Sequence, residues 1–316
     1  MVKKGKKTPQ KSSWSISRRQ LAVLSLLCAL SITVGSIFFL FLWQQSSVIF
    51  SLNAAIIDQL GEDFPNPTFI ENVSSTLESY GFNVKYYDYT QANVTFFKGL
   101  AKGNYGIIIL RVHSALREDQ PIVDFFTSEH YSEQKRYGEY SRDCDQGLLV
   151  EGILNFSEVK EYFAFTPDFV RELEGVFPKS VVFAMGCWSL NSSLMQMAQE
   201  FHEKGAIAYV GWSSMVTVSH TDNETAKLIW RLLFENKTLA KAVSEARKDM
   251  ETGGSFMSYF PSSAENLTLH ALIEEAKVQS ASASFSLINY HNIQFIIVDR
   301  PKNAKKCVVN LRLLTA

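Results

Sequence analysis

Two residues that follow strongly apolar runs have the chemistry of a nucleophile and its base. Cys187 comes after Gly186 at the end of the run VVFAM, and His113 follows the run YGIIILRV. A histidine next to a thiol can take its proton, and the thiolate can attack a carbonyl carbon to form an acyl-enzyme. Gly186 allows a sharp backbone turn, and the backbone N–H groups of Cys187 and Ser114 can receive the developing oxyanion. These residue types predict a His/Cys hydrolase.

An inert role for the thiol is the alternative. Cysteine is among the most buried residue types, and an isolated one usually only fills space. The position of Cys187 directly after Gly186, with His113 at the same point of another apolar run, favours the nucleophile.

The apolar runs are predicted strands that alternate with helices. We expect strands at 54–57, 82–89, 105–112, 180–184, 206–210 and 293–298, and helices at 68–80, 93–101, 167–176, 193–204, 221–234 and 239–250. This alternation predicts an α/β fold, with a mostly parallel sheet flanked by helices on both faces. Ligands bind such sheets outside the carboxyl ends of the strands. His113 and Cys187 each come directly after the carboxyl end of a predicted strand. Residues 114–166 show no clear periodicity, which predicts a long irregular insertion.

Charged and aromatic residues near the strand ends are candidates for the substrate pocket. They are Asp58, Glu129, Trp212 and Asp222. Arg111 lies in an otherwise apolar strand, so we expect it to be paired with a carboxylate such as Asp58 or Glu129. Trp212 fits the core as well as a pocket wall, and Asp222 lines a pocket only if its loop folds back.

The N-terminal part of the chain predicts a membrane anchor. Residues 1–19 carry five Lys and two Arg and no acidic residue, and residues 21–43 contain no charge. An apolar stretch of this length crosses a bilayer core of roughly 30 Å. The charge asymmetry predicts a cytoplasmic tail at 1–19, a signal-anchor helix at 20–44 and an extracytoplasmic domain at 50–316, in a single-pass cell-membrane protein. A cleaved signal peptide is the alternative, but its apolar core is normally shorter.

Glycosylation sequons and cysteines agree with an exported domain. All seven sequons follow the apolar stretch, at Asn72, Asn93, Asn155, Asn191, Asn223, Asn236 and Asn266, and such acceptors imply surface positions. Three cysteines also follow it, and an odd number in an oxidising compartment leaves one thiol over. One possible arrangement pairs Cys144 with Cys307 and leaves Cys187 free.

Several partners and cofactors are not expected. The formal net charge of −1 gives no electrostatic argument for nucleic acid. The Cys and His spacings suggest no metal site, and a His/Cys mechanism needs no cofactor. The expected partners are a protein or peptide substrate and the membrane, and the sequence does not indicate an oligomeric state.

Six segments carry a resemblance to a known group. They are AAIIDQL, YGIIILRVHSA, YFAFTPDFV, VVFAMGCWSL, KGAIAYVGWSSMVTVSHTD and LAKAV, within about residues 52–250. A strand followed by His and a strand followed by Gly-Cys resemble the caspase-like cysteine peptidases (clan CD), which include caspases, legumain, clostripain and gingipains. Together these segments look closer to uncharacterised archaeal and bacterial membrane-anchored relatives of these enzymes. The resemblance implies a caspase-hemoglobinase α/β sandwich with His113 as general base and Cys187 as nucleophile.

The sequence departs from that pattern at two positions. Ser114 stands where most of these peptidases have glycine, and Met185 stands two residues before Cys187, where members specific for basic residues usually have an acid. The expected function is a membrane-anchored extracytoplasmic cysteine peptidase that works through an acyl-enzyme. The alternative is an inactive caspase-like ectodomain that acts as a cell-surface binding or scaffolding module.

Overall fold

The structure, a computed structural model, describes residues 49–155 and 158–279, which belong to one compact unit. The predicted basic tail (1–19), the predicted membrane helix (20–44) and the predicted strand at 293–298 lie outside these residues. Of the helices in the described ranges, none combines the length and the apolar character that a membrane span needs.

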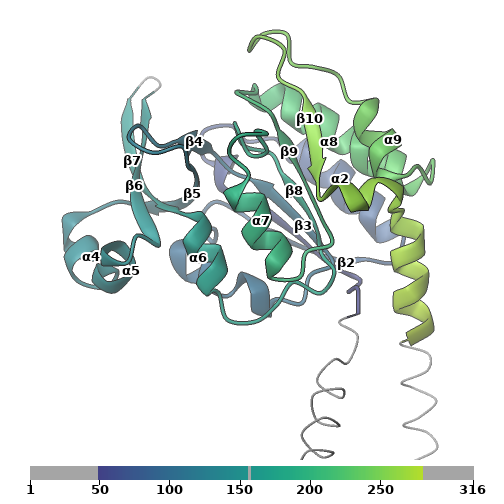
Figure 1. Ribbon diagram of the computed structural model, residues 1–316, viewed down its shortest axis with the longest axis horizontal. Coiled ribbons are helices and arrows are strands. Elements are labelled where there is room, and N and C mark those ends of the chain that lie inside the picture. The colour runs from purple at the N-terminus through teal and green to yellow at the C-terminus, as the bar shows by residue number, and fades with distance from the viewer. Residues whose placement is uncertain (1–48, 156–157, 280–316) are drawn as a thin grey trace, which may run out of the picture. The chain divides into compact units, whose positions relative to one another are not determined.

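A six-stranded sheet forms the centre of the described unit (Figure 1). Its order is β10-β9-β8-β3-β1-β2, and all neighbours are parallel except β10, which runs antiparallel to β9. The strands are β1 (Asn53–Asp58), β2 (Asn83–Tyr87), β3 (Ile107–Arg111), β8 (Val181–Ala184), β9 (Ala208–Trp212) and β10 (Met257–Phe260). This confirms the predicted α/β class and all five strands predicted in the described ranges; β10 was not predicted.

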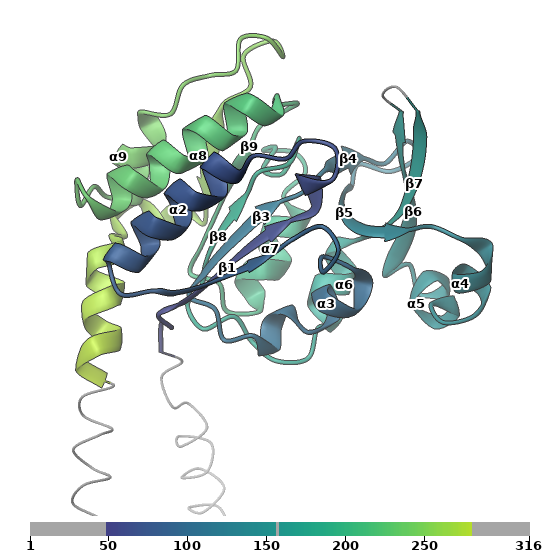
Figure 2. The same cartoon turned by 180° about the vertical axis from the view of Figure 1, so that it is seen from behind.

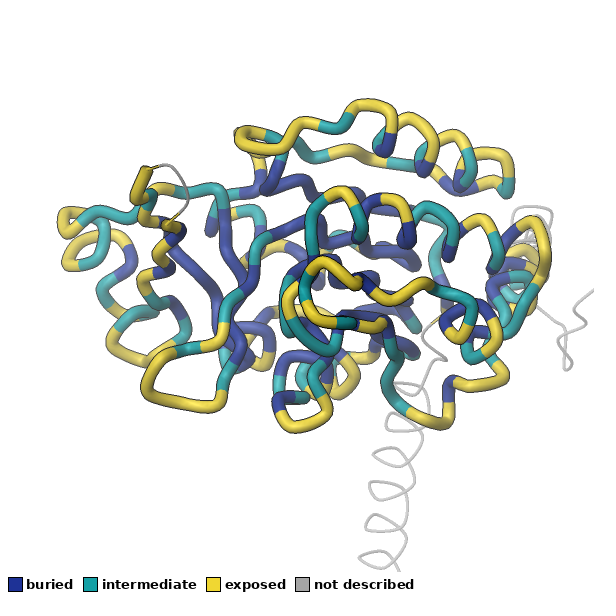
Figure 3. The backbone as a smooth tube through the Cα atoms, turned by 90° about the horizontal axis from the view of Figure 1, so that it is seen from above, coloured by how far each residue is buried: buried dark blue, intermediate teal, exposed yellow. Residues whose placement is uncertain are grey.

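The central strands are largely apolar because helices cover both faces of the sheet. Alternate residues of β3 belong to different cores: Ile108 and Leu110 lie on one face, and Ile107 and Ile109 on the other. Figure 3 shows the strands as the buried interior and the connecting loops as mostly exposed.

The helices divide between these two faces, as Figures 1 and 2 show from opposite sides. One face packs against α2 (Pro67–Ser79), α8 (Val218–Leu233), α9 (Leu239–Ser244) and the helical residues 269–279. The other packs against α3 (Val94–Lys98), α6 (Pro167–Glu172) and α7 (Gln196–Glu203). Short 3-10 turns occupy η1 (Gln59–Gly61), η2 (Leu100–Lys102) and η3 (Ser262–Asn266). The predicted helices are therefore confirmed, although α6 and α9 end earlier than expected.

Residues 114–166 are not irregular, so that prediction was wrong. They form a second, antiparallel sheet of order β4-β5-β7-β6 with two short helices. The elements are β4 (Ser114–Leu116), β5 (Val123–His130), α4 (Glu133–Tyr137), α5 (Ser141–Asp145), β6 (Leu149–Asn155) and β7 (Val159–Phe165). The β6–β7 hairpin, teal in Figure 1, exposes the apolar side chains of Ile153 and Val159 and buries Gly152. These positions interrupt the period-two alternation of apolar and polar residues that marks a half-buried strand.

Two glycines close helices with a positive φ, and they offer a matched test of backbone strain. Gly81 follows α2 at φ 90°, and a Cβ added there would meet nothing within 4 Å. Gly205 follows α7 at φ 108°, and a Cβ there would lie 2.5 Å from the carbonyl oxygen of Phe177. L-residues are strained at such φ values, by roughly 1–2 kcal/mol.

We therefore predict that Gly205→Ala destabilises the protein more than Gly81→Ala. Gly81→Ala adds backbone strain alone, about 1 kcal/mol, whereas Gly205→Ala also forces the chain near Phe177 to shift. Thermal unfolding of both purified variants measures the difference. Equal melting temperatures for the two variants would contradict this prediction.

Candidate active site

The structure brings the segments of His113 and Cys187 together at one rim of the central sheet. Strands β3 and β8 are parallel neighbours, with Leu110 opposite Ala184. His113 follows the end of β3 by two residues and Cys187 follows the end of β8 by three, so both stand just beyond the carboxyl ends of these strands. The hydroxyl of Ser114 donates a hydrogen bond to the carbonyl oxygen of Cys187 at 2.5 Å, which ties the two strand ends together. His113 and Cys187 are both partly buried.

Gly186 makes this close approach possible. A Cβ at this position would lie 2.2 Å from the Ser114 hydroxyl and 2.8 Å from the carbonyl oxygen of Val112. Any larger residue would therefore push the end of β8 away from β3. The sequence motif Gly-Cys thus has a packing reason here, since glycine lets two backbones come together.

The His113 imidazole lies among aromatic rings. Its ring centroid is 6.0 Å from that of Phe64 and 6.3 Å from that of Phe126, both in edge-on geometry. The backbone N–H of His113 donates to Oε1 of Gln59 at 2.8 Å. Burial lowers the pKa of His113 to about 4, and the charge of Arg111 adds to this against the opposite effect of Asp63. The imidazole is therefore neutral at physiological pH and able to accept a proton.

The Cys187 thiol packs against the core beneath α2 and α8, and the backbone of Val216 contacts its sulfur. The sulfur accepts from the Val216 N–H at 3.4 Å, and lies 3.6 Å from the Val216 carbonyl oxygen, to which the thiol donates. Burial raises the pKa of Cys187. A buried apolar setting favours the neutral thiol, so the pair rests uncharged.

Ser114 is well placed to offer its N–H to a substrate. Phe126 N–H donates to the His113 carbonyl at 2.9 Å, and Ser114 is opposite Phe125. In an antiparallel ladder this pattern makes Ser114 and Phe125 a non-hydrogen-bonded pair, so the Ser114 N–H points away from β5. The predicted use of the Ser114 and Cys187 N–H groups as oxyanion donors stays a prediction, but this geometry leaves the first of them available.

Arg111, two residues before His113, is the centre of a buried charge network. Its guanidinium donates to Oδ1 of Asp58 at 2.6 Å and to both carboxylate oxygens of Asp222 at 2.8 Å. A further bond, of 2.8 Å, goes to the carbonyl oxygen of Phe64. The side chains of Arg111, Asp58 and Asp222 are 0, 2 and 4% exposed. The network thus holds the loop whose Phe64 ring packs on His113.

The ion pair expected for Arg111 is therefore present with Asp58, and Asp222 is a second partner that the sequence did not indicate. Both carboxylates offered as pocket acids are bound by one guanidinium, which leaves one negative charge in excess. Burial raises the pKa of Asp58, against the lowering effect of Arg111.

The other two pocket candidates lie elsewhere. Trp212 is fully buried, and its indole N–H donates to the Thr221 hydroxyl at 2.8 Å. Glu129 does not meet Arg111; it forms an ion pair with Lys135 and accepts from Tyr140 at 2.9 Å.

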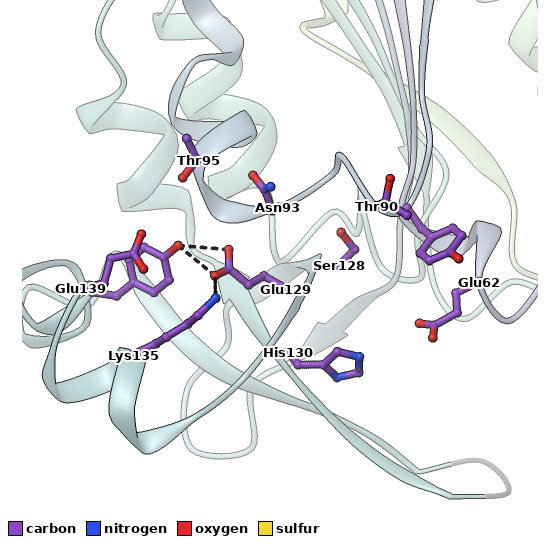
Figure 4. Close-up of a pocket in the computed structure, with 11 residues that line it drawn as sticks. Glu62, Thr90, Asn93, Thr95, Ser128, Glu129, His130, Lys135 and Glu139 are labelled. Carbon is purple, nitrogen blue, oxygen red and sulfur yellow. Dashed lines mark hydrogen bonds and ion pairs between the residues drawn. The ribbon is translucent and has the colours of Figure 1, made fainter.

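Glu129 instead lines a polar cavity of about 400 Å³, shown in Figure 4. Other residues that line it are Glu62, Asn93, His130, Lys135 and Tyr140. A second cavity, of about 460 Å³, is lined by residues that include Asp58, Asn66 and Tyr86. Neither of these two cavities is lined by His113 or Cys187.

The remaining predictions concern modification and metals. Five sequon asparagines are exposed, namely Asn72, Asn155, Asn223, Asn236 and Asn266, whereas Asn93 and Asn191 are half-buried. Cys144 and Cys187 carry free thiols, and Cys307 lies outside the described residues, so the Cys144–Cys307 disulfide stays a prediction. Among residues 49–155 and 158–279, no group of three or more potential ligands could hold a metal ion.

Sequence reasoning missed the loop that closes over the thiol, residues 213–217. Val216 brackets the sulfur, and the Asp249 carboxylate holds the loop by accepting from the N–H of Thr217 at 2.7 Å and from its hydroxyl at 3.0 Å. Neither Val216 nor Asp249 has a sequence signal of its own, because their roles arise from contacts between distant segments.

No protein-family model matches the chain, and a search of the curated proteins gives no significant match.

Replacing Arg111 tests the buried network. We predict that Arg111→Met costs about 3–5 kcal/mol, because two buried carboxylates lose their counter-charge. The triple variant Arg111→Met, Asp58→Asn, Asp222→Asn should recover much of this loss. Chemical denaturation of both variants gives the free energies of unfolding. An Arg111→Met variant within about 1 kcal/mol of the parent would contradict the network's role.

The lowered pKa of His113 predicts a pH dependence of stability. Between the unfolded pKa of about 6.5 and the folded pKa of about 4, the unfolded state binds more protons. Stability should therefore be unaffected above pH 6.5 and fall as the pH drops toward 4, by at most about 3 kcal/mol.

The control is the His113→Asn variant, whose free energy of unfolding is measured over the same pH range. The difference in unfolding free energy between parent and variant should change between pH 6.5 and 4 and stay constant above this range. A difference that is constant down to pH 4 would show that His113 titrates normally.

Proposed function

We propose that this chain is a membrane-anchored extracytoplasmic cysteine peptidase of the caspase-like type, with His113 as general base and Cys187 as nucleophile. The observation that supports it best is the shared rim: β3 and β8 are parallel neighbours, His113 and Cys187 follow their carboxyl ends, and Ser114 binds the Cys187 carbonyl. The mostly parallel sheet between two layers of helices is compatible with a caspase-hemoglobinase sandwich.

The neutral pair defines how the reaction would run. As the Cys187 sulfur forms a bond to the scissile carbonyl carbon, the thiol proton passes to the His113 imidazole, and the carbonyl oxygen becomes an oxyanion. The N–H groups of Ser114 and Cys187 would stabilise this oxyanion. When the C–N bond breaks, the imidazolium gives its proton to the leaving amine. A water molecule, deprotonated by His113, then breaks the thioester and restores the thiol.

The anchored topology belongs to the same proposal. It is supported by the uncharged stretch at 21–43, by the basic residues before it and by the sequons that all follow it. Exposure of Asn72, Asn155, Asn223, Asn236 and Asn266 makes these five the best glycan acceptors. Asn93 and Asn191 are poorer ones, because Asn93 caps α3 through Phe96 N–H and the Asn191 amide donates to Ser213 O.

A second candidate function is a binding or scaffolding ectodomain without turnover. One observation favours it: the two cavities described above lie away from the thiol, so a ligand could bind there without meeting Cys187. In this case the His113–Cys187 pair would have only a structural role.

A peptidase assay separates the two functions. We predict that the purified chain hydrolyses peptides from a quenched-fluorescence library, and that Cys187→Ala abolishes this hydrolysis. His113→Asn should reduce it by about 10²–10⁴-fold, the usual contribution of a general base. Because the pKa of His113 is about 4, the acid limb of kcat/KM should lie near pH 4, well below that of an ordinary histidine.

Hydrolysis that survives in Cys187→Ala would contradict the proposed nucleophile. No hydrolysis by the parent chain, together with ligand binding that Cys187→Ala leaves unchanged, would favour the binding module.

A further inference from the structure

The Arg111 network holds one more negative charge than positive charge, and this excess is buried. One guanidinium binds the carboxylates of Asp58 and Asp222, whose side chains are 2 and 4% exposed. Removing a charge from water is unfavourable unless a counter-charge lies close by. Burial accordingly raises the pKa of Asp58, although Arg111 acts in the opposite direction. The network is therefore one positive charge short.

The excess charge is least compensated at one oxygen, Oδ2 of Asp58. The Arg111 guanidinium donates to Oδ1 of Asp58 and to both carboxylate oxygens of Asp222. The amide of Asn66 also donates to Asp222, at 2.8 Å. The donor to Oδ2 of Asp58 is instead the uncharged hydroxyl of Tyr86, at 3.1 Å. Because a carboxylate oxygen can accept two hydrogen bonds, Oδ2 has room for a further, charged donor.

Asp58 lines the open cavity of about 460 Å³ described above, which is in the size range of small-molecule sites. Its acidic residues are Asp58 and Glu71, and no Lys, Arg or His is among the described residues that line it. A Cβ at Gly61, which also lines the cavity, would lie 2.9 Å from Oδ2 of Asp58. The lack of a side chain there leaves space beside this oxygen. Much of the remaining wall is apolar and comes from Pro65, Pro67, Ile70 and the Tyr86 ring.

An organic cation fits this cavity better than a metal ion does. Among residues 49–155 and 158–279, no three potential ligands are grouped for a metal ion, and apolar walls offer few of the oxygen ligands that hard cations need. An ammonium or guanidinium group on an apolar stem matches both features of the cavity, because its N–H groups bind a carboxylate and its stem packs on apolar surface. The Tyr86 ring, 43% exposed, adds an aromatic face for the cation.

We infer that this cavity binds an organic cation, an ammonium or guanidinium group on an apolar stem, with Oδ2 of Asp58 as its main acceptor. The cation supplies the counter-charge that the Arg111 network lacks, and the exposed Glu71 adds to the attraction. This chemistry is shared by small organic amines and by lysine and arginine side chains. Because neither His113 nor Cys187 lines the cavity, the inference does not depend on the proposed peptidase activity.

Benzamidine tests the inference on the full-length chain in detergent. It carries an amidinium group on a flat apolar ring, and benzamide has nearly the same shape without the charge. Isothermal titration calorimetry at pH 7 should show benzamidine binding at least about tenfold more tightly than benzamide, as expected for a charge-assisted hydrogen bond. Equal affinities, or no binding of benzamidine, would overturn the inference; equal affinities would indicate that a proton on Asp58 compensates the network instead.

A second pair of compounds distinguishes the two sources of the cation. N-acetyl-arginine N-methylamide presents an arginine side chain on a peptide backbone, and the same compound made with citrulline is its uncharged control. Tighter binding of the arginine compound would support a basic side chain of a polypeptide as the ligand. Binding of benzamidine without binding of the arginine compound would support a free organic amine, and either result keeps the cation site.

Asp58→Asn locates the acceptor. The variant removes the excess charge, keeps the shape of the side chain and leaves Arg111 paired with Asp222, so it should fold. Its affinity for benzamidine should fall at least about tenfold, whereas Glu71→Gln, at an exposed carboxylate, should have a smaller effect. Unchanged benzamidine binding in Asp58→Asn would place the cation elsewhere and overturn the assignment.

Gly61→Ala separates space from charge. It keeps every charge and places a Cβ against Oδ2 of Asp58, so benzamidine should bind more weakly; unchanged binding would contradict contact with this oxygen. Cys187→Ala should bind benzamidine as the parent does, because the thiol does not line the cavity. A loss of binding in Cys187→Ala would overturn the separation of the cation site from the thiol.

Discussion

The contact between the ends of β3 and β8 is the constraint on which the site depends. Ser114 donates to the Cys187 carbonyl, and Gly186 has no side chain to keep the two backbones apart. This contact joins the segments that follow the two strands, and so brings those of His113 and Cys187 to one rim of the sheet. The serine at position 114, which departs from the glycine expected by resemblance, therefore has a role of its own: its hydroxyl joins the two strand ends.

Buried electrostatics organise the space around that contact. The Arg111 network joins β1, β3 and α8 and also holds the backbone of Phe64, whose ring lies against His113. Such a network is costly to desolvate, so it is informative mainly about geometry: it fixes which segments meet and in what arrangement. By binding both Asp58 and Asp222, the single arginine leaves one negative charge in excess within the network.

Much of the fold could be predicted from sequence because buried parallel strands have a strong local signal. The run that forms β8 is apolar throughout and that of β3 is apolar up to Arg111, and the residues that follow them must meet at one rim once the strands are neighbours. The second sheet could not be predicted in this way, since β6 and β7 expose the apolar residues Ile153 and Val159 and so lack a regular alternation of apolar and polar residues. The partners of the site had no local signal either: Gln59, Phe64, Val216 and Asp249 reach it only through tertiary contacts.

Cross-linking positions 113 and 187 tests most directly whether His113 and Cys187 are neighbours. In a His113→Cys variant, the new thiol should form a disulfide with Cys187 under mild oxidation, because the proposed dyad requires the two positions to be neighbours and Ser114 already binds the Cys187 carbonyl. A disulfide spans a Cα separation of about 4.4–6.8 Å. Ala115→Cys, two residues further along, should not form this bond. Non-reducing peptide mass spectrometry that finds a 113–187 linkage would support the account, and free thiols at both positions after oxidation would contradict it.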